Sequence, residues 1–201
     1  MKQLAILVAL IGLILPACNT KKETEPPKEL QTPPPSAMPE GHPGLGITSV
    51  AGVQWTKPAR WTEGPARTMR VATYVVPAAE GDAEGGECGV FYFGSGQGGD
   101  VQMNIDRWAQ QFENPRGPER TTKAVNGLNV VMVKIAGTYL APGGPMMQAT
   151  GKHENYRLLG AIVAAPEGSV FFKLTGPAKT IGAAERDFDS LVASLRAVSP
   201  R

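Results

Sequence analysis

Residues 157–177 read RLLGAIVAAPEGSVFFKLTGP, and this stretch decides the expected fold. The runs Arg157–Ala165 and Ser169–Thr175 are rich in aliphatic and aromatic side chains and flank Pro166-Glu167-Gly168, a combination typical of a β-hairpin. Strands joined by so short a turn are antiparallel. The second run ends at Gly176-Pro177, and proline is favoured in the first turn of a helix. The stretch therefore predicts two antiparallel strands followed directly by a helix.

The segments on both sides continue this pattern. Thr121–Val125 and Leu128–Tyr139 flank Asn126-Gly127, a strong short-range signal for a hairpin turn. We expect residues 140–156 to form a long loop between the two hairpins. After the second hairpin, apolar residues recur at the spacing of one helix face. They are Ile181, Ala184, Phe188, Leu191, Leu195 and Val198.

Three shorter segments upstream predict further strands. Val53–Thr62 predicts a short strand and a turn. Met69–Val76 and Cys88–Phe93 are rich in β-branched and aromatic residues, which favour strands. Between them, Ala78–Gly86 consists of small and acidic residues and predicts a surface loop.

A second helix is expected between these strands and the first hairpin. Asp100 is a favourable N-cap residue, and we expect the helix to run to about Phe112 and to be ended by Asn114-Pro115. Its apolar face consists of Val101, Ile105, Trp108 and Phe112. Two helices with one apolar face each need a sheet to cover. The expected fold class is therefore α+β, an antiparallel β-sheet flanked by helices in an α/β/α sandwich.

The composition of the 201 residues excludes several functional classes. The net charge of +2 is too small for the basic surface that nucleic-acid-binding proteins usually carry. Two cysteines cannot build a disulfide-dense scaffold or a cysteine-rich metal site, and two histidines make a histidine-based catalytic or metal site improbable. We therefore expect no nucleic-acid partner, no metal and no cofactor.

The first eighteen residues predict a targeting signal. One lysine precedes the apolar run Leu4–Leu15, which is too short to span a bilayer but fits the central region of a signal peptide. The run ends in Leu15-Pro16-Ala17-Cys18, which resembles the lipobox of bacterial lipoproteins. By that resemblance residues 1–17 are removed and Cys18 is acylated on its thiol and on its new amine. The alternatives are an ordinary signal peptide or a short buried helix, with Cys18 incidental.

The next segment is expected to be a tether. Residues 18–48 hold seven prolines, charges of alternating sign and almost no large apolar residue, so they cannot offset the entropy of ordering. Residues 49–201 have the composition of one globular domain. Asn19, in place of the aspartate that marks inner-membrane retention, favours the periplasmic face of the outer membrane. The expected product is a lipid-anchored domain held off a membrane in the cell envelope.

The segment Gly94–Gly99 reads GSGQGG and matches the dinucleotide-binding pattern G-x-G-x-x-G between a predicted strand and a predicted helix. A parallel strand should follow that motif, whereas here a hairpin follows. The favoured interpretation is a turn that caps the helix. An anion or partner site at the helix start, and a nucleotide site, are the alternatives. The residues that would contact such a ligand are Gly96, Gln97, Gly99, Asn104 and Arg107.

Structural roles are expected for the remaining polar candidates. Asn104 shares the apolar helix face and is expected to be a buried bracket with satisfied hydrogen bonds, and Arg107 is expected to pair with carbonyls of the turn. Cys88 is expected to be a small buried hydrophobic residue, and His153 a solvated loop residue. No serine lies in a G-x-S-x-G elbow, and the sequence offers no nucleophile–base pair as a catalytic site.

Several features together resemble a known family. They are the order of strands, the Trp55–Pro58–Trp61 opening, the stretch from Phe93-Gly94 through Gly99, Asn104, Arg107-Trp108, and the ending Phe171–Pro177 before a helix that closes in Ser194-Leu195-Arg196. Over about residues 50–198 the chain resembles a family of uncharacterised bacterial lipoproteins and exported proteins, whose architecture is similar to the PsbP/DcrB-like superfamily. The resemblance implies an antiparallel sheet between helical layers. Members of the superfamily assist assemblies, in the oxygen-evolving complex of photosystem II and in nuclear transport by Ran, and the resemblance implies no catalytic residues.

The functional expectation follows from the anchor and from this resemblance. The chain is expected to be a membrane-anchored periplasmic lipoprotein with a non-enzymatic accessory or binding domain, acting on an unknown protein partner. The alternative is a small-molecule or anion-binding protein, or an enzyme, that uses the Gly94–Gly99 turn at the helix N-terminus.

Overall fold

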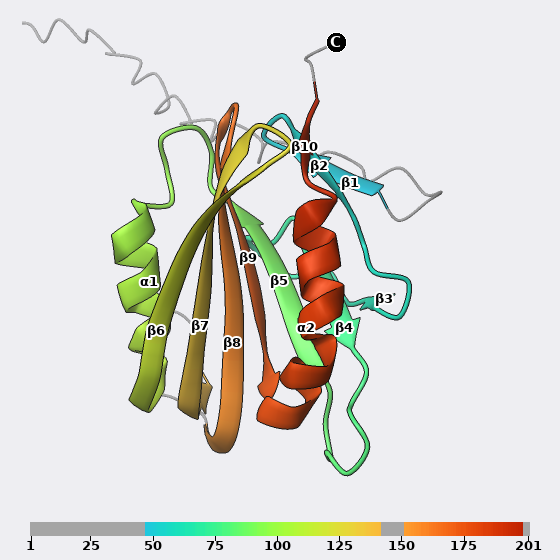
Figure 1. The fold of residues 1–201 in the computed structure, drawn as a ribbon, viewed down its shortest axis with the longest axis vertical. Helices are drawn as coiled ribbons and strands as arrows, with labels where there is room; N and C mark the ends of the chain where they lie inside the picture. The colour runs from blue at the N-terminus through green and yellow to red at the C-terminus, as the bar shows by residue number, and fades with distance from the viewer. Residues whose placement is uncertain (1–46, 142–150, 199–201) are drawn as a thin grey trace, which may run out of the picture. The chain divides into compact units, whose positions relative to one another are not determined.

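The structure is a computed structural model that describes residues 47–141 and 151–198 (Figure 1). The predicted signal, Cys18 and nearly all of the predicted tether lie outside the described residues. The described elements are β1 (Ile47–Val50), β2 (Val53–Thr56), β3 (Thr62–Glu63), β4 (Ala72–Val76), β5 (Gly86–Tyr92), α1 (Val101–Ala109), β6 (Phe112–Val125), β7 (Leu128–Ala141), β8 (Gly151–Ala165), β9 (Gly168–Pro177), α2 (Ala178–Ala193) and β10 (Arg196–Ala197). No helix among them is long and apolar enough to cross a membrane.

The main sheet has seven antiparallel strands in the order β3-β4-β5-β9-β8-β7-β6. The predicted hairpin around Pro166-Glu167 is confirmed, since Ala165 pairs with Gly168 and the register continues to Tyr156 opposite Pro177. A small sheet of order β1-β2-β10 joins the start of the described chain to its end. Two helices with two antiparallel sheets confirm the predicted α+β class.

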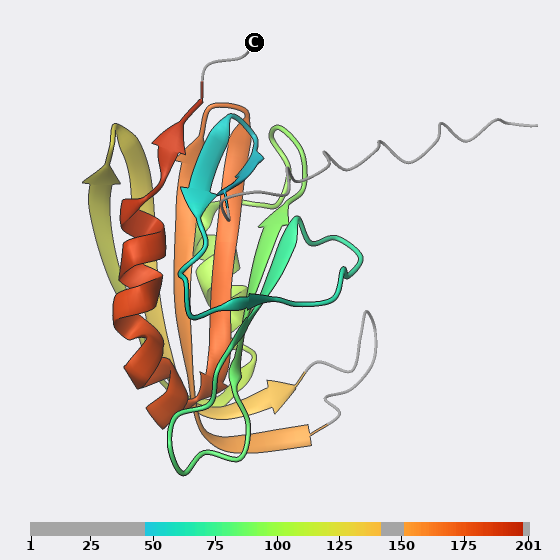
Figure 2. The same cartoon turned by 90° about the vertical axis from the view of Figure 1, so that its right-hand side faces the viewer.

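The sheet is buried on both faces, and each face has its own helix. Phe172 and Leu174 of β9 lie in one core with the apolar stripe of α2, whereas Phe171 lies in the other core with Ile105 and Trp108 of α1. This division follows from the strand, because successive side chains point to opposite faces. Figures 1 and 2 show the two helices on different sides of the strands.

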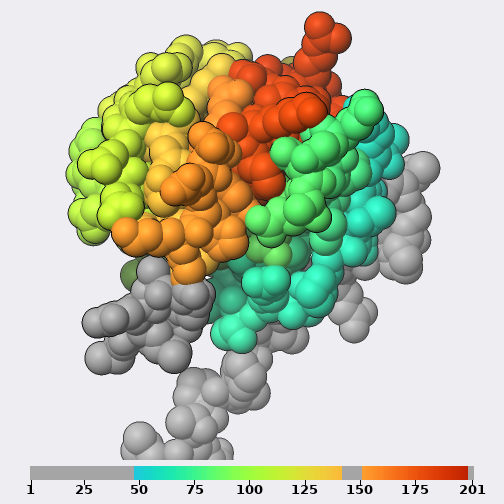
Figure 3. Space-filling view, turned by 90° about the horizontal axis from the view of Figure 1, so that it is seen from below, coloured from blue at the N-terminus to red at the C-terminus, as the bar shows by residue number. Residues whose placement is uncertain are grey.

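The N-terminus of α2 is capped by a residue distant in sequence. Pro177 occupies the cap position and offers no side-chain hydrogen bond. Asp82, from the loop before β5, instead accepts the backbone N–H and the hydroxyl of Thr180, at 2.9 and 2.6 Å. A carboxylate there also favours the positive end of the helix dipole. Figure 3 shows this loop, in green, against the start of α2, in red.

The predicted end of the first helix is wrong. α1 ends at Ala109, and Phe112 begins β6 instead of closing the helix. Phe112 nevertheless belongs to the same core as Ile105 and Trp108. The apolar spacing therefore correctly grouped side chains that share one core. Phe112, however, enters that core from strand β6 and not from the helix.

Pro115, which was expected to end the helix with Asn114, lies within strand β6, as does Pro118. β6 is an edge strand, where a missing backbone N–H costs no ladder bond. Its register with β7 shifts twice, between Glu113 and Arg116 and between Arg116 and Glu119, and Pro115 and Pro118 lie in these two shifts. The strand therefore continues past both prolines to the predicted Asn126-Gly127 turn.

The predicted loop 140–156 is wrong at both of its ends. β7 continues to Ala141 and β8 begins at Gly151, with Tyr139 opposite His153. The hairpin extends beyond the part of the sheet that the helices cover, so its residues lack the apolar alternation that marks a buried strand. Residues 142–150 of the predicted loop lie outside the described residues.

A single glycine on β8 allows α1 to approach the sheet. A Cβ atom built on Gly160 would lie 2.2 Å from Cζ3 of Trp108 and 2.9 Å from its Cε3. Trp108 is 5% exposed, and its ring packs directly against this backbone position. The indole is thus seated on the backbone of β8.

We predict that Gly160→Ala lowers the free energy of unfolding by about 1–3 kcal/mol, because overpacking forces Trp108 and α1 outward. Chemical denaturation of the full chain measures this change. Gly182→Ala is the matched control, since Gly182 is exposed within α2 and its Cβ would meet only Arg157 Nη1 at 3.5 Å. That substitution should stabilise by about 0.5–1 kcal/mol. Equal effects of the two substitutions on stability would contradict the close packing of the Trp108 ring on Gly160.

Candidate functional site

The Gly94–Gly99 turn is closed by the chain itself. Gly94, Gly96, Gly98 and Gly99 all have positive φ, which explains why glycine occupies these positions. A Cβ on Gly98 would also lie 2.9 Å from the rings of Phe93 and Phe171. The glycines therefore serve the turn's own backbone and its packing on the sheet.

Two side chains occupy the helix start at which a ligand was considered. Asp100 caps α1 by accepting the N–H of Met103 at 2.8 Å. Asn104 is 2% exposed and donates to the carbonyl oxygens of Gly98 and Asp100, each at 2.8 Å. The prediction that Asn104 is a buried residue with satisfied hydrogen bonds is confirmed. Arg107 was expected to bind the turn's carbonyls, and this is wrong, because Asn104 takes that role.

The five residues predicted as possible contacts separate into two groups. Gly96, Gln97 and Gly99 lie in the turn and are outside the lining of the neighbouring cavity. Asn104 and Arg107 line that cavity, which lies between α1 and the main sheet. The structure therefore places two of the five beside a hollow, at the inner face of the helix.

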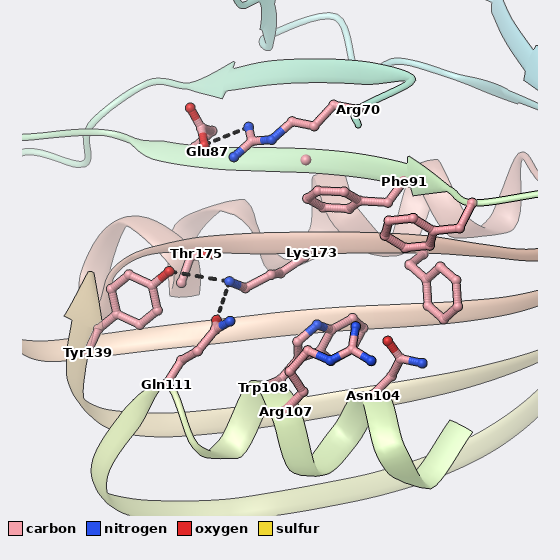
Figure 4. Close-up of a pocket in the computed structure, with 13 residues that line it drawn as sticks. Arg70, Glu87, Phe91, Asn104, Arg107, Trp108, Gln111, Tyr139, Lys173 and Thr175 are labelled. Atoms are coloured by element: carbon pink, nitrogen blue, oxygen red, sulfur yellow. Dashed lines mark hydrogen bonds and ion pairs between the residues drawn. The ribbon is translucent and has the colours of Figure 1, made fainter. Parts of the chain in front are cut away.

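This hollow, the α1 cavity, has a volume of about 290 Å³ (Figure 4). Its lining comes from β5, β9, α1 and the adjacent segments: Arg70, Glu87, Gly89, Phe91, Phe93, Asn104, Arg107, Trp108, Gln111, Tyr139, Phe171, Lys173 and Thr175. The registers Glu87 with Thr175 and Phe91 with Phe171 place these side chains in a row on one face of the sheet. Opposite them, Asn104, Arg107 and Trp108 project from α1 toward the strands.

Lys173 is the central polar group of the α1 cavity. It lies on β9, opposite Gly89, and its Nζ donates to Oε1 of Gln111 and, at 3.3 Å, to the hydroxyl of Tyr139. Burial and, secondarily, the neighbouring Arg70 lower the pKa of Lys173 from 10.5 to about 8. A glycine opposite the lysine leaves room above the strand for the guanidinium of Arg70, which would lie 3.3 Å from a Cβ on Gly89.

The one carboxylate that lines the α1 cavity is already neutralised. Glu87 accepts from Arg70 at 2.8 Å and forms an ion pair with Arg67 at 2.9 Å. Arg70 also lies 5.4 Å from the ring centroid of Phe91, within the range of a cation–π contact. The cavity is consequently richer in positive than in negative charge.

A second hollow of about 380 Å³ shares Glu87, Tyr139 and Thr175 with the α1 cavity. Here Tyr156 donates to Glu84 and stacks on Tyr139, with ring centroids 5.8 Å apart. Burial raises the pKa of Tyr139 to about 12 and also raises that of Tyr156. Both phenols therefore remain protonated donors at neutral pH.

The two other candidates from the sequence have different outcomes. His153 was expected in a loop, but it lies on β8, with its Nδ1 3.5 Å from Glu84 and its ring 4.9 Å from that of Tyr156. Cys88 is fully buried on the α2 side, as predicted, and burial raises the pKa of its thiol. In the described part of the chain, no group of three or more His, Cys, Asp or Glu residues is arranged to hold a metal.

Sequence reasoning missed Lys173, Arg70, Gln111 and Tyr139 as site residues. A usable signal existed only for Lys173, in the alternation of Phe171, Lys173 and Thr175 along a strand expected to be covered on both faces. A lysine on such a strand must face a gap under a helix. Arg70 and Tyr139 reach the cavity through long-range pairing that no local pattern encodes.

Known proteins resemble this chain in fold. No protein-family model matches the sequence, and no curated protein matches it. The solved structure of a cyanobacterial PsbP protein (CyanoP) from Synechocystis has a TM-score of 0.48 at 10% identity and covers 78% of this chain and 96% of its own. A Pseudomonas aeruginosa protein of unknown function has a TM-score of 0.43 at 12% identity, over 71% of this chain and 99% of its own. These likenesses concern the fold alone.

We predict that Lys173→Met raises the free energy of unfolding at pH 7 by about 1–2 kcal/mol, because an apolar side chain of similar length removes a buried charge. In the wild-type protein, the destabilisation caused by the charge on Lys173 is fully present below pH 8. It disappears as pH rises from about 8 to 10.5, where the unfolded state binds the proton and the folded state does not. Denaturation at several pH values should therefore show the two proteins converging at alkaline pH.

Lys123→Met is the control, since Lys123 is a surface residue 3.8 Å from Asp189. Its removal should change stability by less than about 1 kcal/mol with no comparable convergence. A Lys173→Met protein that is less stable than the wild type at pH 7 would contradict the desolvation argument.

Proposed function

We propose that the protein is a lipid-anchored, non-enzymatic binding protein of the bacterial cell envelope, and that the α1 cavity is its ligand site. One observation carries the proposal: a cavity of about 290 Å³ combines aromatic walls with convergent polar donors. Small-molecule sites are typically concave, mostly apolar and lined by a few placed polar groups, with volumes from about 300 Å³ upward. The α1 cavity has this composition at the small end of that range.

Binding explains the polar lining better than catalysis does. The polar groups that line the cavity are three cations, two amides, a hydroxyl, a phenol and the carboxylate of Glu87, which is ion-paired with Arg67 and Arg70. Such groups can hold and orient a ligand. Tyr139 stays protonated because burial raises its pKa to about 12, which suits a hydrogen-bond donor better than a general base. The proposal therefore assigns recognition to these residues.

The site differs from the one considered at the Gly94–Gly99 turn. There the helix N-terminus is satisfied by Asp100, so an anion would have to displace the chain's own carboxylate. Asn104 and Arg107 remain relevant because they also face the α1 cavity. The ligand site of the proposal thus lies along the inner face of α1.

The anchor is part of the same proposal and rests on the sequence around Cys18. Acyl chains on this residue would hold the protein at a membrane, since two or more chains anchor stably where one does not. The proline-rich residues 18–48 would then act as a spacer, and the periplasmic face of the outer membrane is the proposed location. Membership of a lipoprotein family belongs to this proposal.

A protein partner stays a prediction of the sequence. Large exposed hydrophobic side chains in the described part of the chain are Met69, Val75 and Met103. Protein interfaces usually bury a contiguous patch with aromatic anchors. The cavity, rather than a surface patch, is the feature that favours a specific function.

We predict that Cys18→Ser releases the protein from the membrane fraction or leaves its precursor unprocessed, because serine cannot carry the thioether-linked lipid. Fractionation with immunoblotting measures both outcomes. Cys88→Ala is the matched control, as it removes the other cysteine and should leave the protein in the membrane fraction. Unchanged fractionation of the Cys18→Ser protein would contradict the anchor.

We predict that small bicyclic aromatic compounds raise the melting temperature of the full chain by binding in the α1 cavity. The panel is naphthoate, naphthamide and naphthylmethylammonium, which differ in charge and share one ring system. Thr175→Phe should abolish the shift, because Thr175 lines the cavity and a phenyl group there fills it.

Thr121→Phe is the control for added aromatic area, since Thr121 is exposed on β6. It should leave the shift unchanged. The assignment of the cavity as a ligand site fails if no member of the panel stabilises the wild-type chain, or if the Thr175→Phe protein responds equally.

A further inference from the structure

We infer that the ligand of the α1 cavity is a small organic anion with a flat apolar body, its carboxylate held by Lys173 and Arg107 and its body held between aromatic rings. The inference rests on the proposed function and adds the chemical class of the ligand. Three kinds of observation carry it: the charge of the lining, the present partners of Lys173 and the shape of the aromatic wall.

The first observation is an excess of positive charge. The α1 cavity is lined by three cationic side chains, Arg70, Arg107 and Lys173, and by one carboxylate, Glu87. Glu87 already has Arg70 at 2.8 Å and Arg67 at 2.9 Å. Within the described residues, Lys173 and Arg107 therefore have no carboxylate partner. An anion in the cavity would supply the missing counter-charge.

The second observation is that Lys173 is held by neutral oxygens. Its ammonium group donates to the amide of Gln111 and to the hydroxyl of Tyr139 (Figure 4). A ligand carboxylate can replace the amide oxygen of Gln111 as the acceptor of the Lys173 ammonium group. The exchange is favourable because hydrogen bonds between two charged groups are about twice as strong as neutral ones.

The third observation is the aromatic wall beyond the lysine. Phe91 and Phe93 are stacked, with ring centroids 6.2 Å apart and planes inclined by 15°. The ring centroids of Phe171 and Phe93 lie 5.9 Å apart, and Trp108 lines the cavity from the helix side. Rings arranged in this way favour a flat ligand, and a volume of about 290 Å³ limits its size to roughly that of a bicyclic ring.

Charge recognition of this kind has a defined pH dependence. The charged or titratable groups that face Lys173 are Arg70 before β4, Glu87 on β5, Tyr139 on β7 and Arg107 on α1. Burial moves the pKa of Lys173 close to neutrality, to about 8. An anion binds the protonated amine, so its affinity falls as pH rises through this value. A neutral ligand of the same shape has no such dependence.

The test compares naphthoate with naphthamide, which share size and shape and differ in charge. Isothermal titration of the full chain in detergent, with the Thr175→Phe protein in the same detergent as baseline, gives the two dissociation constants. We expect naphthoate to bind at least about tenfold more tightly at pH 7, the ratio given by one charge-assisted hydrogen bond. Between pH 7 and 9.5 this preference should fall severalfold.

Substitutions test which residues cause the preference for naphthoate over naphthamide. Lys173→Met should remove most of the preference for naphthoate while leaving naphthamide binding within about twofold, and Arg107→Gln should reduce the preference severalfold. Lys123→Met, a charge change on β6 outside the cavity lining, is the control and should leave both constants unchanged. Should the Lys173→Met protein fail to fold, the pH titration of the wild type still decides.

Two results would overturn the inference. Equal affinity for both probes, or a preference independent of pH and of Lys173, refutes an anionic ligand and leaves the cavity as a ligand site. If neither probe binds above the Thr175→Phe baseline, the proposed function fails as well. The two failures are therefore distinguishable.

Discussion

The contact between Trp108 and Gly160 sets how closely α1 approaches the sheet. The indole covers the glycine backbone so tightly that even a methyl group would overlap with it. Asn104 fixes the start of the helix to the turn, and Phe112 buries the chain just beyond its end. Held at these places along one line, α1 cannot collapse onto β5 and β9. The α1 cavity is the space that remains, so its dimensions follow from the packing of α1 on the sheet.

The opposite face shows what the sheet does without such a constraint. There α2 lies on an apolar core in which Phe172, Leu174 and Phe188 are fully buried, and Trp55 meets Phe172 edge to face at 5.0 Å. Its polar contacts include the buried hydrogen bond from Trp55 Nε1 to the hydroxyl of Tyr74 and the one between Thr180 and Asp82 at the helix end. The two faces of the sheet thus contribute differently to the domain. The α2 side supplies the stability that allows the α1 side to keep a hollow and a lysine that, within the described residues, has no carboxylate partner.

The sequence predicted most of the fold because most of its turns are local. Asn126-Gly127 and Pro166-Glu167 specify hairpins within a few residues, and from two such hairpins the antiparallel sheet follows. The errors arose where tertiary position overrode a local signal. Pro115 ends a helix in most contexts, but on an edge strand it is tolerated within a register shift. The α1 cavity was harder still, since its residues come from five separate segments, and only Asn104 and Arg107 were identified beforehand.

Lys173 shows why a site of this kind is visible in a structure and almost invisible in a sequence. On an ordinary half-exposed strand its alternation with Phe171 and Thr175 would place it in solvent, and it would carry no information. Because α1 covers this face, the same lysine is half-buried and its pKa falls to about 8. A domain selected for stability alone would place an apolar side chain at this position, as it does at Phe172 and Leu174 on the other face. The lysine is therefore best explained by an interaction that offsets the cost of burying it, and in this cavity a negatively charged group meets that requirement.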